Sequence, residues 1–361
     1  MSVTGQEQGR AERPGPASRT QRTPSERRQG RFTTAWGKPA LLLIGIGLLA
    51  LVAALSIAVG SNPLPLGTVW SALWAPDGSF EATVVASRLP RTQLGILIGA
   101  ALAVSGCLIQ GVTRNALGDP GLLGINSGAA AAVVTLAAVT GISAGPVLTL
   151  VAVVGAFVAA LAVYAVGSSG RSSTPVRLVL AGAAITAVLG AYIQAVTLIN
   201  PQVFASYRYW AIGSIVGQHP DTVDLLWPVV TVGLVAACLL GRALNTLSMG
   251  EETAVALGAR TGRTRLAAAL IATILAGVAT AAVGPIGFVG LAVPHLVRPF
   301  TGSDHRWLLP ASAIFGGILL LGADIIGRVI ARPSEIAVGI VVAFIGAPFL
   351  YAAVRHSRSG L

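Results

Sequence analysis

Residues 88–129 read RLPRTQLGILIGAALAVSGCLIQGVTRNALGDPGLLGINSGA. An arginine pair leads into an apolar segment rich in small residues, and a polar turn separates it from a second apolar segment. The block 92–112 has the length of about 20 residues that a helix needs to cross a bilayer. Within it, Gly95, Gly99 and Ala103 recur at four-residue spacing. This stretch therefore predicts a membrane-spanning helix that packs closely against other helices, with cationic residues at one end.

The composition extends this prediction to the whole chain. Of 361 residues, 54% are hydrophobic and only 10% charged, with a mean hydropathy of +0.78. Soluble domains carry about 25% charged residues. In lipid every backbone polar group must be paired internally, so apolar blocks of this length should be helices. We therefore expect an all-α polytopic membrane protein.

Nine apolar blocks of near-spanning length follow a basic tail, residues 1–38, which we expect to be disordered and cytoplasmic. A shorter apolar piece, 285–297, is bracketed by prolines. The last residues, 356–361, form a second basic tail. The predicted spans are 39–60, 92–112, 121–139, 145–167, 177–199, 224–241, 264–283, 285–297, 308–327 and 336–354.

The short piece decides the predicted topology. Two basic ends on the cytoplasmic side require an even number of crossings, so 285–297 is counted as a tenth span and the membrane domain covers 39–355. This arrangement leaves nineteen of the 24 Lys and Arg residues on the cytoplasmic side. Such an excess is the expected positive-inside bias.

Signatures of several other classes of protein are missing from the sequence. It contains no P-loop and no HExxH, and Lys38 is its only lysine, so ATP binding of the P-loop type is excluded. The basic residues that give the net charge of +11 lie between apolar blocks rather than along one soluble face. This distribution argues against a nucleic-acid-binding protein. We expect no catalytic site, cofactor or metal site; metal-ligand spacing is absent among His219, His295, His305, His356, Cys107 and Cys238.

An ion-driven transporter would be expected to carry ionisable groups within its spans. Asp324 is nearly the only candidate, and its four-residue spacing to Arg328 favours local pairing on a helix. The energy source is therefore expected to be another subunit.

Two polar regions are candidates for binding other proteins. The loop 242–265 has a helical apolar pattern interrupted at Gly250; it is either a solvated hairpin or a short helical lever that seats in a soluble partner. On the opposite side of the membrane, three basic residues are exceptions to the positive-inside bias, namely Arg88, Arg91 and Arg328. They either extend to lipid head groups or meet carboxylates of an extracytoplasmic partner.

Four ordered blocks together resemble the FecCD/BtuC-type permease family of ABC importers, which carry iron–siderophore complexes, haem or cobalamin. They are RLPR at 88–91, the block 105–129, GEETAVALG at 250–258, and GPIGFVGLAVPHLVRPFTGSDHRWLLP at 284–310 with ADIIGR and GAPFLY after it. The chain departs from the family at Ala116, Met249 and Ala337, where members often have other residues.

The resemblance implies a type II ABC importer permease fold with ten transmembrane helices. It also implies a second permease subunit, identical or homologous, two cytoplasmic ABC ATPases that hydrolyse ATP, and an extracytoplasmic siderophore-binding protein. The expected location is the cytoplasmic membrane of a bacterium, in contact with lipid and with both termini cytoplasmic.

The resemblance further implies roles for particular residues. Docking of the binding protein would fall to Arg88, Arg91 and Arg328. Coupling to the ATPase would fall to Gly250, Glu251, Glu252, Ala254, Leu257 and Gly258. The cytoplasmic gate would lie at Thr174, Pro175, Val176 and Arg177. Polar candidates for lining the path are Gln110, Asn126, Gln194 and Asn200, for which ordinary interhelical hydrogen bonding is the alternative.

These expectations combine into one functional hypothesis: the chain is the permease subunit of an ATP-driven importer that moves a ferric siderophore by alternating access. A cobalamin or haem cargo is the alternative within this class. An ion-coupled secondary transporter is the alternative from another class, and the shortage of intramembrane carboxylates argues against it.

Overall fold

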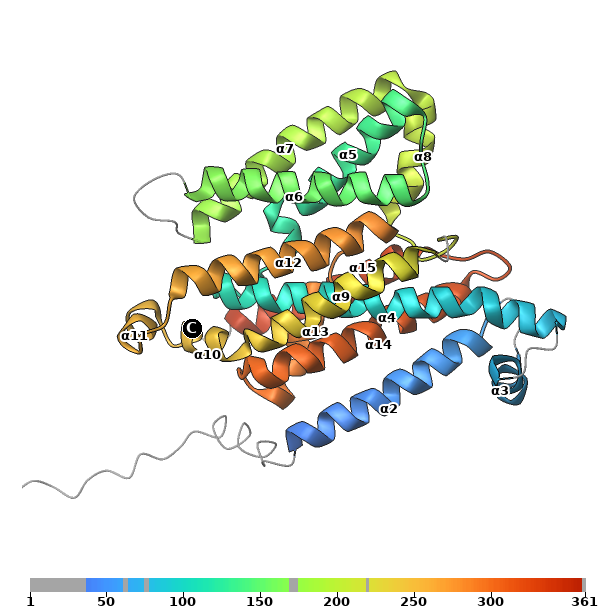
Figure 1. Cartoon of the computed structure of the whole chain (residues 1–361), viewed down its shortest axis with the longest axis horizontal. Coiled ribbons are helices and arrows are strands. Elements are labelled where there is room, and N and C mark those ends of the chain that lie inside the picture. The colour runs from blue at the N-terminus through green and yellow to red at the C-terminus, as the bar shows by residue number, and fades with distance from the viewer. Residues whose placement is uncertain (1–36, 61–63, 75–77, 169–174, 219–220, 359–361) are drawn as a thin grey trace, which may run out of the picture.

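The computed structural model describes residues 37–60, 64–74, 78–168, 175–218 and 221–358, and the regular structure in these ranges is entirely helical (Figure 1). The expected tail 1–38 lies outside them except for Gly37 and Lys38, which begin the first described helix. The elements are α2 (Gly37–Ala58), α3 (Leu66–Trp74), α4 (Phe80–Thr113), the 3-10 helix η1 (Pro120–Leu123), α5 (Ile125–Thr140), α6 (Pro146–Ser168), α7 (Pro175–Ile199), α8 (Pro201–Ile212), α9 (Asp221–Leu239), α10 (Gly241–Ser248), α11 (Glu251–Ala256), α12 (Thr261–Val283), α13 (Val289–Thr301), α14 (His305–Ile330) and α15 (Val338–Arg358).

Seven of the described helices are long and apolar enough to cross a membrane: α2, α4, α6, α7, α9, α12 and α14. The shorter apolar helix α5 and the segment Val338–Pro348 of α15 add two candidates. With α13, these elements correspond one to one to the ten predicted spans, although their bounds differ in places. The all-helical membrane fold is therefore confirmed, whereas ten crossings remain a prediction.

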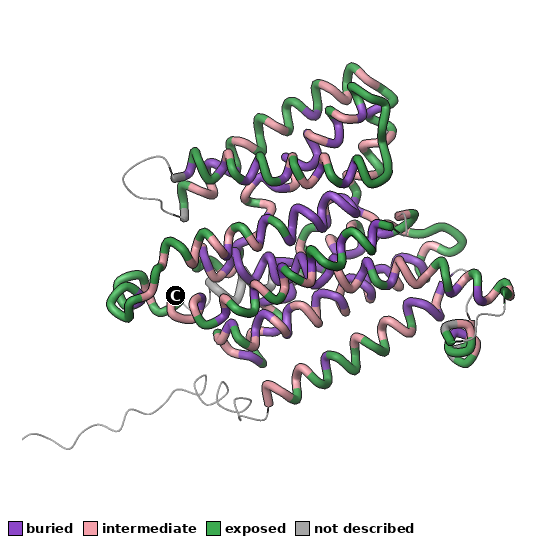
Figure 2. Tube along the Cα trace, in the orientation of Figure 1, coloured by how far each residue is buried: buried purple, intermediate pink, exposed green. Residues whose placement is uncertain are grey.

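Helix α4 is the centre of the main bundle. Its most apolar window is 83% buried inside the chain, compared with 17% for α2 and 11% for α7. It packs against α14, α12, α13 and α9, and Figure 2 shows the buried trace concentrated on these central helices. Helices α5 to α8 form a second group, which meets the main bundle mainly where α6 and α5 contact α12.

Glycine brings α4 and its neighbours into backbone contact. A Cβ atom on Gly99 would overlap the carbonyl group of Gly316 in α14, and one on Gly106 would overlap the backbone of Gly290 in α13. Lipid provides no hydrophobic force between helices, so such close approach supplies much of their association. The predicted packing face at Gly95, Gly99 and Ala103 is confirmed, because Gly95 and Gly99 face α14 and Ala103 lies against Gly316.

Two helices differ from their predicted bounds. The block 92–112 is only part of α4, which begins at Phe80 after the N-cap Ser79 and runs through Pro90. At 1.5 Å per residue such a helix is about 50 Å long, so its first turns extend beyond the hydrocarbon layer. The predicted span 285–297 is shifted, because residues 284–287 are irregular and α13 runs on to Thr301 through two prolines. Only residues 302–304 therefore separate α13 from α14.

The two ends of the bundle carry different elements. Helices α10 and α11 lie at one end, which we call the elbow end (Figure 1). The start of α2 and the end of α15 lie at this end too. Helices α3 and α8, the start of α4 and the 331–337 segment lie at the opposite end, which we call the far end. The first described helix, α2, thus begins on the same side of the bundle on which the last, α15, ends.

Substitution of Gly99 by Ala tests the glycine contact. The added Cβ atom would meet backbone atoms of Gly316 and Gly317, which cannot rotate away, so we expect about 1–3 kcal/mol of destabilisation. The matched control is Gly47→Ala in α2, where a Cβ atom meets nothing within 4 Å. Unfolding of the purified variants in detergent measures the difference. Equal stability of the two variants would contradict the close approach.

Candidate docking and coupling sites

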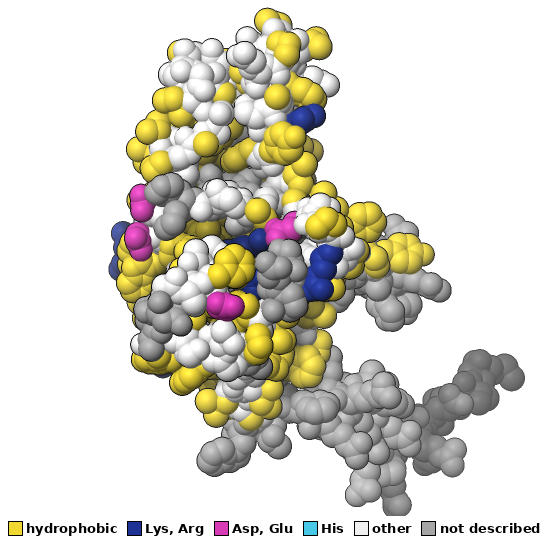
Figure 3. Space-filling view, turned by 90° about the vertical axis from the view of Figure 1, so that its right-hand side faces the viewer, with side chains coloured by type: hydrophobic (Ala, Val, Ile, Leu, Met, Phe, Trp, Pro, Cys, Tyr) yellow, Lys and Arg dark blue, Asp and Glu magenta, His cyan; other side chains and the backbone are white. Residues whose placement is uncertain are grey.

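Five charged side chains form a group at the far end that we call the far-end cluster: Arg88 and Arg91 from α4, Asp324 and Arg328 from α14, and Glu335 from the irregular segment before α15. Figure 3 looks onto this end and shows basic side chains next to an acidic one near the middle of the face. The cluster holds three positive and two negative groups, which leaves it cationic.

Arg91 uses both sides of its guanidinium group. Nε and Nη2 donate to the carboxylate of Asp324, with Nη2 at 2.7 Å from Oδ1. On the other side, Nη1 donates to Oε2 of Glu335 at 2.8 Å. The Asp324 side chain is 1% exposed and that of Glu335 is 29% exposed. Arg91 therefore has one buried partner and one that water reaches.

Arg328 points into the bundle rather than out of it. Its Nη1 donates to the backbone oxygens of Ser56 and Val59, and its Nη2 donates to Ser56 Oγ. Nη2 also lies 2.8 Å from Oδ2 of Asp324, so the predicted local pairing of Asp324 with Arg328 is confirmed. The carbonyl groups at a helix C-terminus lack hydrogen-bond donors within the helix and carry partial negative charge. Arg328 supplies donors and a positive charge to these groups at the end of α2.

Arg88 caps the same helix end, because its Nη1 donates to the backbone oxygens of Ile57 and Ala58. Of the three arginines predicted to dock a partner, Arg88 and Arg91 are thus half-buried and Arg328 is buried at 2% exposure. Direct contact of Arg328 with a partner does not fit this geometry. The sequence pattern predicted that all three lie at the same end of the bundle, which the structure confirms, but a charge bias carries no information about burial.

At the elbow end, α10 is fixed firmly to the bundle. Leu244 and Leu247 are buried, and Arg114 at the end of α4 donates to the Leu247 carbonyl at 2.6 Å. Asn245 donates to Asp304, the N-cap of α14, at 2.6 Å and accepts from the backbone N–H of His305.

Burial by itself raises the pKa of Asp304. The hydrogen bonds from Asn245 and from the Arg306 backbone outweigh this effect and leave that pKa below its usual value. The carboxylate therefore stays charged as the acceptor that joins α10 to α14.

Helix α11 lies beyond these attachments and forms the tip of what we call the elbow, residues 241–258. Gly250 and Gly258 have positive φ angles of 115° and 76° and bracket α11, as the sequence pattern predicts. Ala254 is fully buried, whereas Glu251 is 55% exposed and forms an ion pair with Arg265 of α12. The tip also presents exposed apolar side chains to solvent, namely Met249, Val255 and Leu257.

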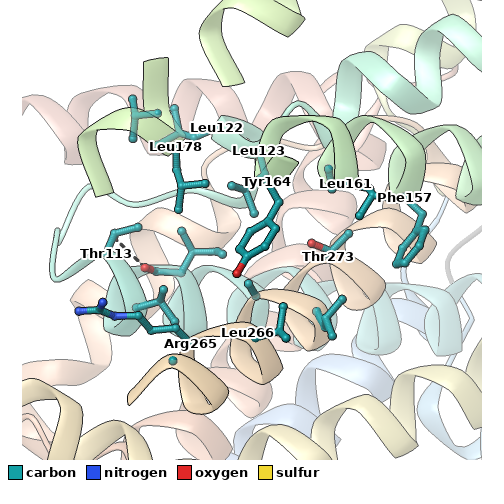
Figure 4. A pocket seen from close by; sticks show the side chains of 17 residues that line it. Thr113, Leu122, Leu123, Phe157, Leu161, Tyr164, Leu178, Arg265, Leu266 and Thr273 are labelled. Atoms are coloured by element: carbon teal, nitrogen blue, oxygen red, sulfur yellow. Dashed lines mark hydrogen bonds between the residues drawn. The ribbon is translucent and has the colours of Figure 1, made fainter. Parts of the chain in front are cut away.

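The predicted gate lies only partly within the described residues, since Thr174 falls outside them and of Pro175 only the helical backbone is described. Val176 and Arg177 are exposed in the first turn of α7. Close to them is a cavity of about 170 Å³ between α4, η1, α6, α7 and α12 (Figure 4). Its lining is mostly apolar, with Tyr164 directed into it.

The four polar residues proposed to line the path divide into two pairs. Gln110 donates to the Gly290 carbonyl and accepts from Arg298, and Asn126 accepts from Thr280. Both therefore bridge helices, which is the alternative role considered from the sequence. Gln194 is exposed on α7, and Asn200 lines a cavity of about 560 Å³ at the far end.

A larger far-end cavity of about 740 Å³ lies between α6, α8, α9, α12 and the 331–337 segment. Tyr209, Trp210, Gln218 and Glu335 are among the residues that line it. Sequence reasoning missed this cavity and the contact of Glu335 with Arg91. No local signal points to either, because the residues involved are far apart in the sequence. Among the described residues, no group of three His, Cys, Asp or Glu side chains is placed to hold a metal ion.

Replacement of Arg328 by Gln tests its internal role. Asp324 would lose one of its cationic partners, and the end of α2 would lose a cap, so we expect the free energy of unfolding to fall by about 3 kcal/mol. Arg332→Gln, one turn further and exposed, is the matched control and should change it by less than about 0.5 kcal/mol. Unfolding in detergent distinguishes these outcomes, and an Arg328 variant as stable as the unmodified protein would exclude this internal role.

Known proteins share this sequence and architecture. The model of the FecCD transport family matches residues 48–356. The ferric enterobactin transport system permease protein FepD of Escherichia coli (strain K12) is 46% identical over 330 residues, which cover 91% of this chain and 97% of that protein. The hemin transport system permease protein HmuU of Yersinia pestis is 38% identical over 337 residues, with coverages of 90% and 98%.

A solved metal-chelate type ABC transporter in an inward-facing conformation superposes with a TM-score of 0.76 and 26% identity, over 88% of this chain and 99% of that chain. The family match covers most of the sequence, including the far-end cluster and the elbow, and confirms the resemblance read from the motifs. The chain belongs to the FecCD transport family and is a multi-pass permease of the bacterial inner membrane.

Proposed function

We propose that the chain is the membrane subunit of an ATP-driven importer that carries a ferric siderophore into the cell. The observation that carries this proposal is the 46% identity with a ferric enterobactin permease along nearly the full length of both proteins. A haem cargo is the second candidate, since a hemin permease is 38% identical over a similar length.

In this proposal the elbow end faces the cytoplasm and the far end faces outward. Nineteen of the 24 Lys and Arg residues then fall on the cytoplasmic side. This orientation follows the positive-inside rule. It also places both termini in the cytoplasm.

The elbow is the proposed contact with a cytoplasmic ATPase. Exposed Met249, Val255 and Leu257 form an apolar tip at the elbow end, outside the helices that are long and apolar enough to cross a membrane. Such a surface suits a groove on a soluble partner. Because α10 is attached to both α4 and α14, movement of the tip would be transmitted to the centre of the bundle.

The far end is the proposed contact with an extracytoplasmic binding protein. Arg88 and Arg91 lie at the surface-proximal side of a cationic cluster, and arginine pairs strongly with carboxylates. In this proposal Arg328 supports the docking surface from beneath, by holding the end of α2 next to Arg88.

A second permease subunit completes the proposed path. Helix α7 is the least buried of the long apolar helices, and its exposed side chains include Val176, Leu180, Val188 and Leu198. This face is free to contact lipid or a second permease. ATP-driven rocking of the two subunits would then open the path between them alternately to each side.

Reconstituted transport tests the function. The chain is placed in liposomes with its ATPase, its partner permease and the binding protein, and uptake of ferric siderophore, haem and cobalamin is compared. We expect ATP-dependent uptake with a clear preference for a ferric siderophore. Accumulation by the chain alone, without ATPase, would contradict the proposal, and preference for haem would select the second candidate.

Glu251→Arg tests the elbow. The reversed charge should uncouple ATP hydrolysis from uptake. The protein should stay folded, because the Glu251 side chain is 55% exposed. The double variant Glu251→Arg with Arg265→Glu restores the ion pair within the chain. We expect it to remain uncoupled if Glu251 acts on the ATPase. Normal uptake by the single variant, or full rescue by the double variant, would argue against that contact.

A further inference from the structure

We propose that Glu335 is an internal competitor for docking: its carboxylate occupies the position on Arg91 that a carboxylate of the binding protein takes when it docks. This inference rests on the proposed contact of the far end with a binding protein. In this proposal Glu335 weakens that contact by competing for Arg91, whereas Asp324 strengthens it by holding Arg91 in position.

The geometry of Arg91 separates the two carboxylates. Asp324 binds Nε and Nη2 together, which fixes the plane of the guanidinium group. Glu335 binds only Nη1, the remaining end of the group, at 2.8 Å. An incoming carboxylate can therefore replace Glu335 without disturbing the Asp324 contact.

Burial makes one exchange easy and the other difficult. Asp324 is 1% exposed and is shared with Arg328, so removing it from Arg91 would leave buried charges without their partner. Glu335 is 29% exposed. An ion pair that water reaches is worth about 0.2–1 kcal/mol, because water solvates the separated charges nearly as well. Glu335 can therefore be displaced by a competing carboxylate.

The local chain permits this displacement. Glu335 lies in the irregular segment between α14 and α15, whereas the backbone of the next residue, Ile336, is held by the Gly327 carbonyl. Only the Glu335 side chain has to rotate, and it already lines the open 740 Å³ cavity into which it could turn. Release of Glu335 also makes the cluster more cationic, which favours an acidic partner.

The experiment measures the affinity of the binding protein for the complete transporter in nanodiscs, at low salt and at about 0.3 M salt. Glu335→Gln should raise the affinity about two- to fivefold at low salt, the factor that corresponds to an exposed ion pair, and less at high salt. Asp324→Asn should lower the affinity, because Arg91 loses its orientation. Two neighbouring acidic residues are thus expected to have opposite effects.

Asp224→Asn is the matched control. Asp224 is an exposed carboxylate in the first turn of α9, at the same end of the molecule. If it raises the affinity as much as Glu335→Gln does, the effect is a general one of charge and the proposal is overturned. Unfolding in detergent checks that Glu335→Gln retains the stability of the unmodified protein, and a gain of affinity in a destabilised variant would also count against the competition.

Arg91→Glu separates failure of this inference from failure of the docking proposal. If Arg91→Glu abolishes binding while Glu335→Gln leaves the affinity unchanged or lower, docking stands and the competition is excluded. If Arg91→Glu has no effect, the far end is not the docking surface and both proposals fail.

Discussion

The backbone contact between α4 and α14 is the constraint on which the rest of the structure depends. Lipid tails compete equally for apolar side chains, so helices in a membrane are held by close approach and by polar contacts between them. Gly99 and Gly316 permit that approach at the middle of the bundle. The same two helices supply the far-end cluster at one end and the attachments of α10 at the other. Arg91 and Arg114 are therefore carried by one continuous helix, about 35 Å apart at 1.5 Å per residue.

The charged groups of the bundle follow a simple rule of burial. Deeply buried ones, such as Asp324 and Arg328, bind one another, Arg91 and the end of α2, and they fix the position of α2 and α14. Those near the surface, such as Glu335 and Glu251, pair through a single arginine that water also reaches. Buried pairs give fixed geometry, whereas accessible pairs can be exchanged for groups of another protein at little cost.

The sequence was sufficient to predict the helical membrane fold, the approximate spans, the glycine face of α4 and the two short helices of the elbow. These features depend on local composition and on spacing within one helix, as does the pairing of Asp324 with Arg328 four residues later. The contact of Asp324 with Arg91 joins residues 233 positions apart, so no local pattern could predict it. The burial of Arg328 was missed for a related reason, because its partners are backbone oxygens of α2 that any sequence would carry.

The occupation of Asp324 also bears on how such a bundle can be driven. A carboxylate that couples transport to an ion must gain and lose that ion during the cycle. Asp324 is held by two arginines, whose own positions depend on it. Binding and release of an ion there would disturb the α2–α4–α14 junction rather than open a path. The elbow, in contrast, combines a tip that is accessible to a soluble protein with a base attached to α4 and α14, so force applied at α11 reaches the bundle through contacts that remain intact.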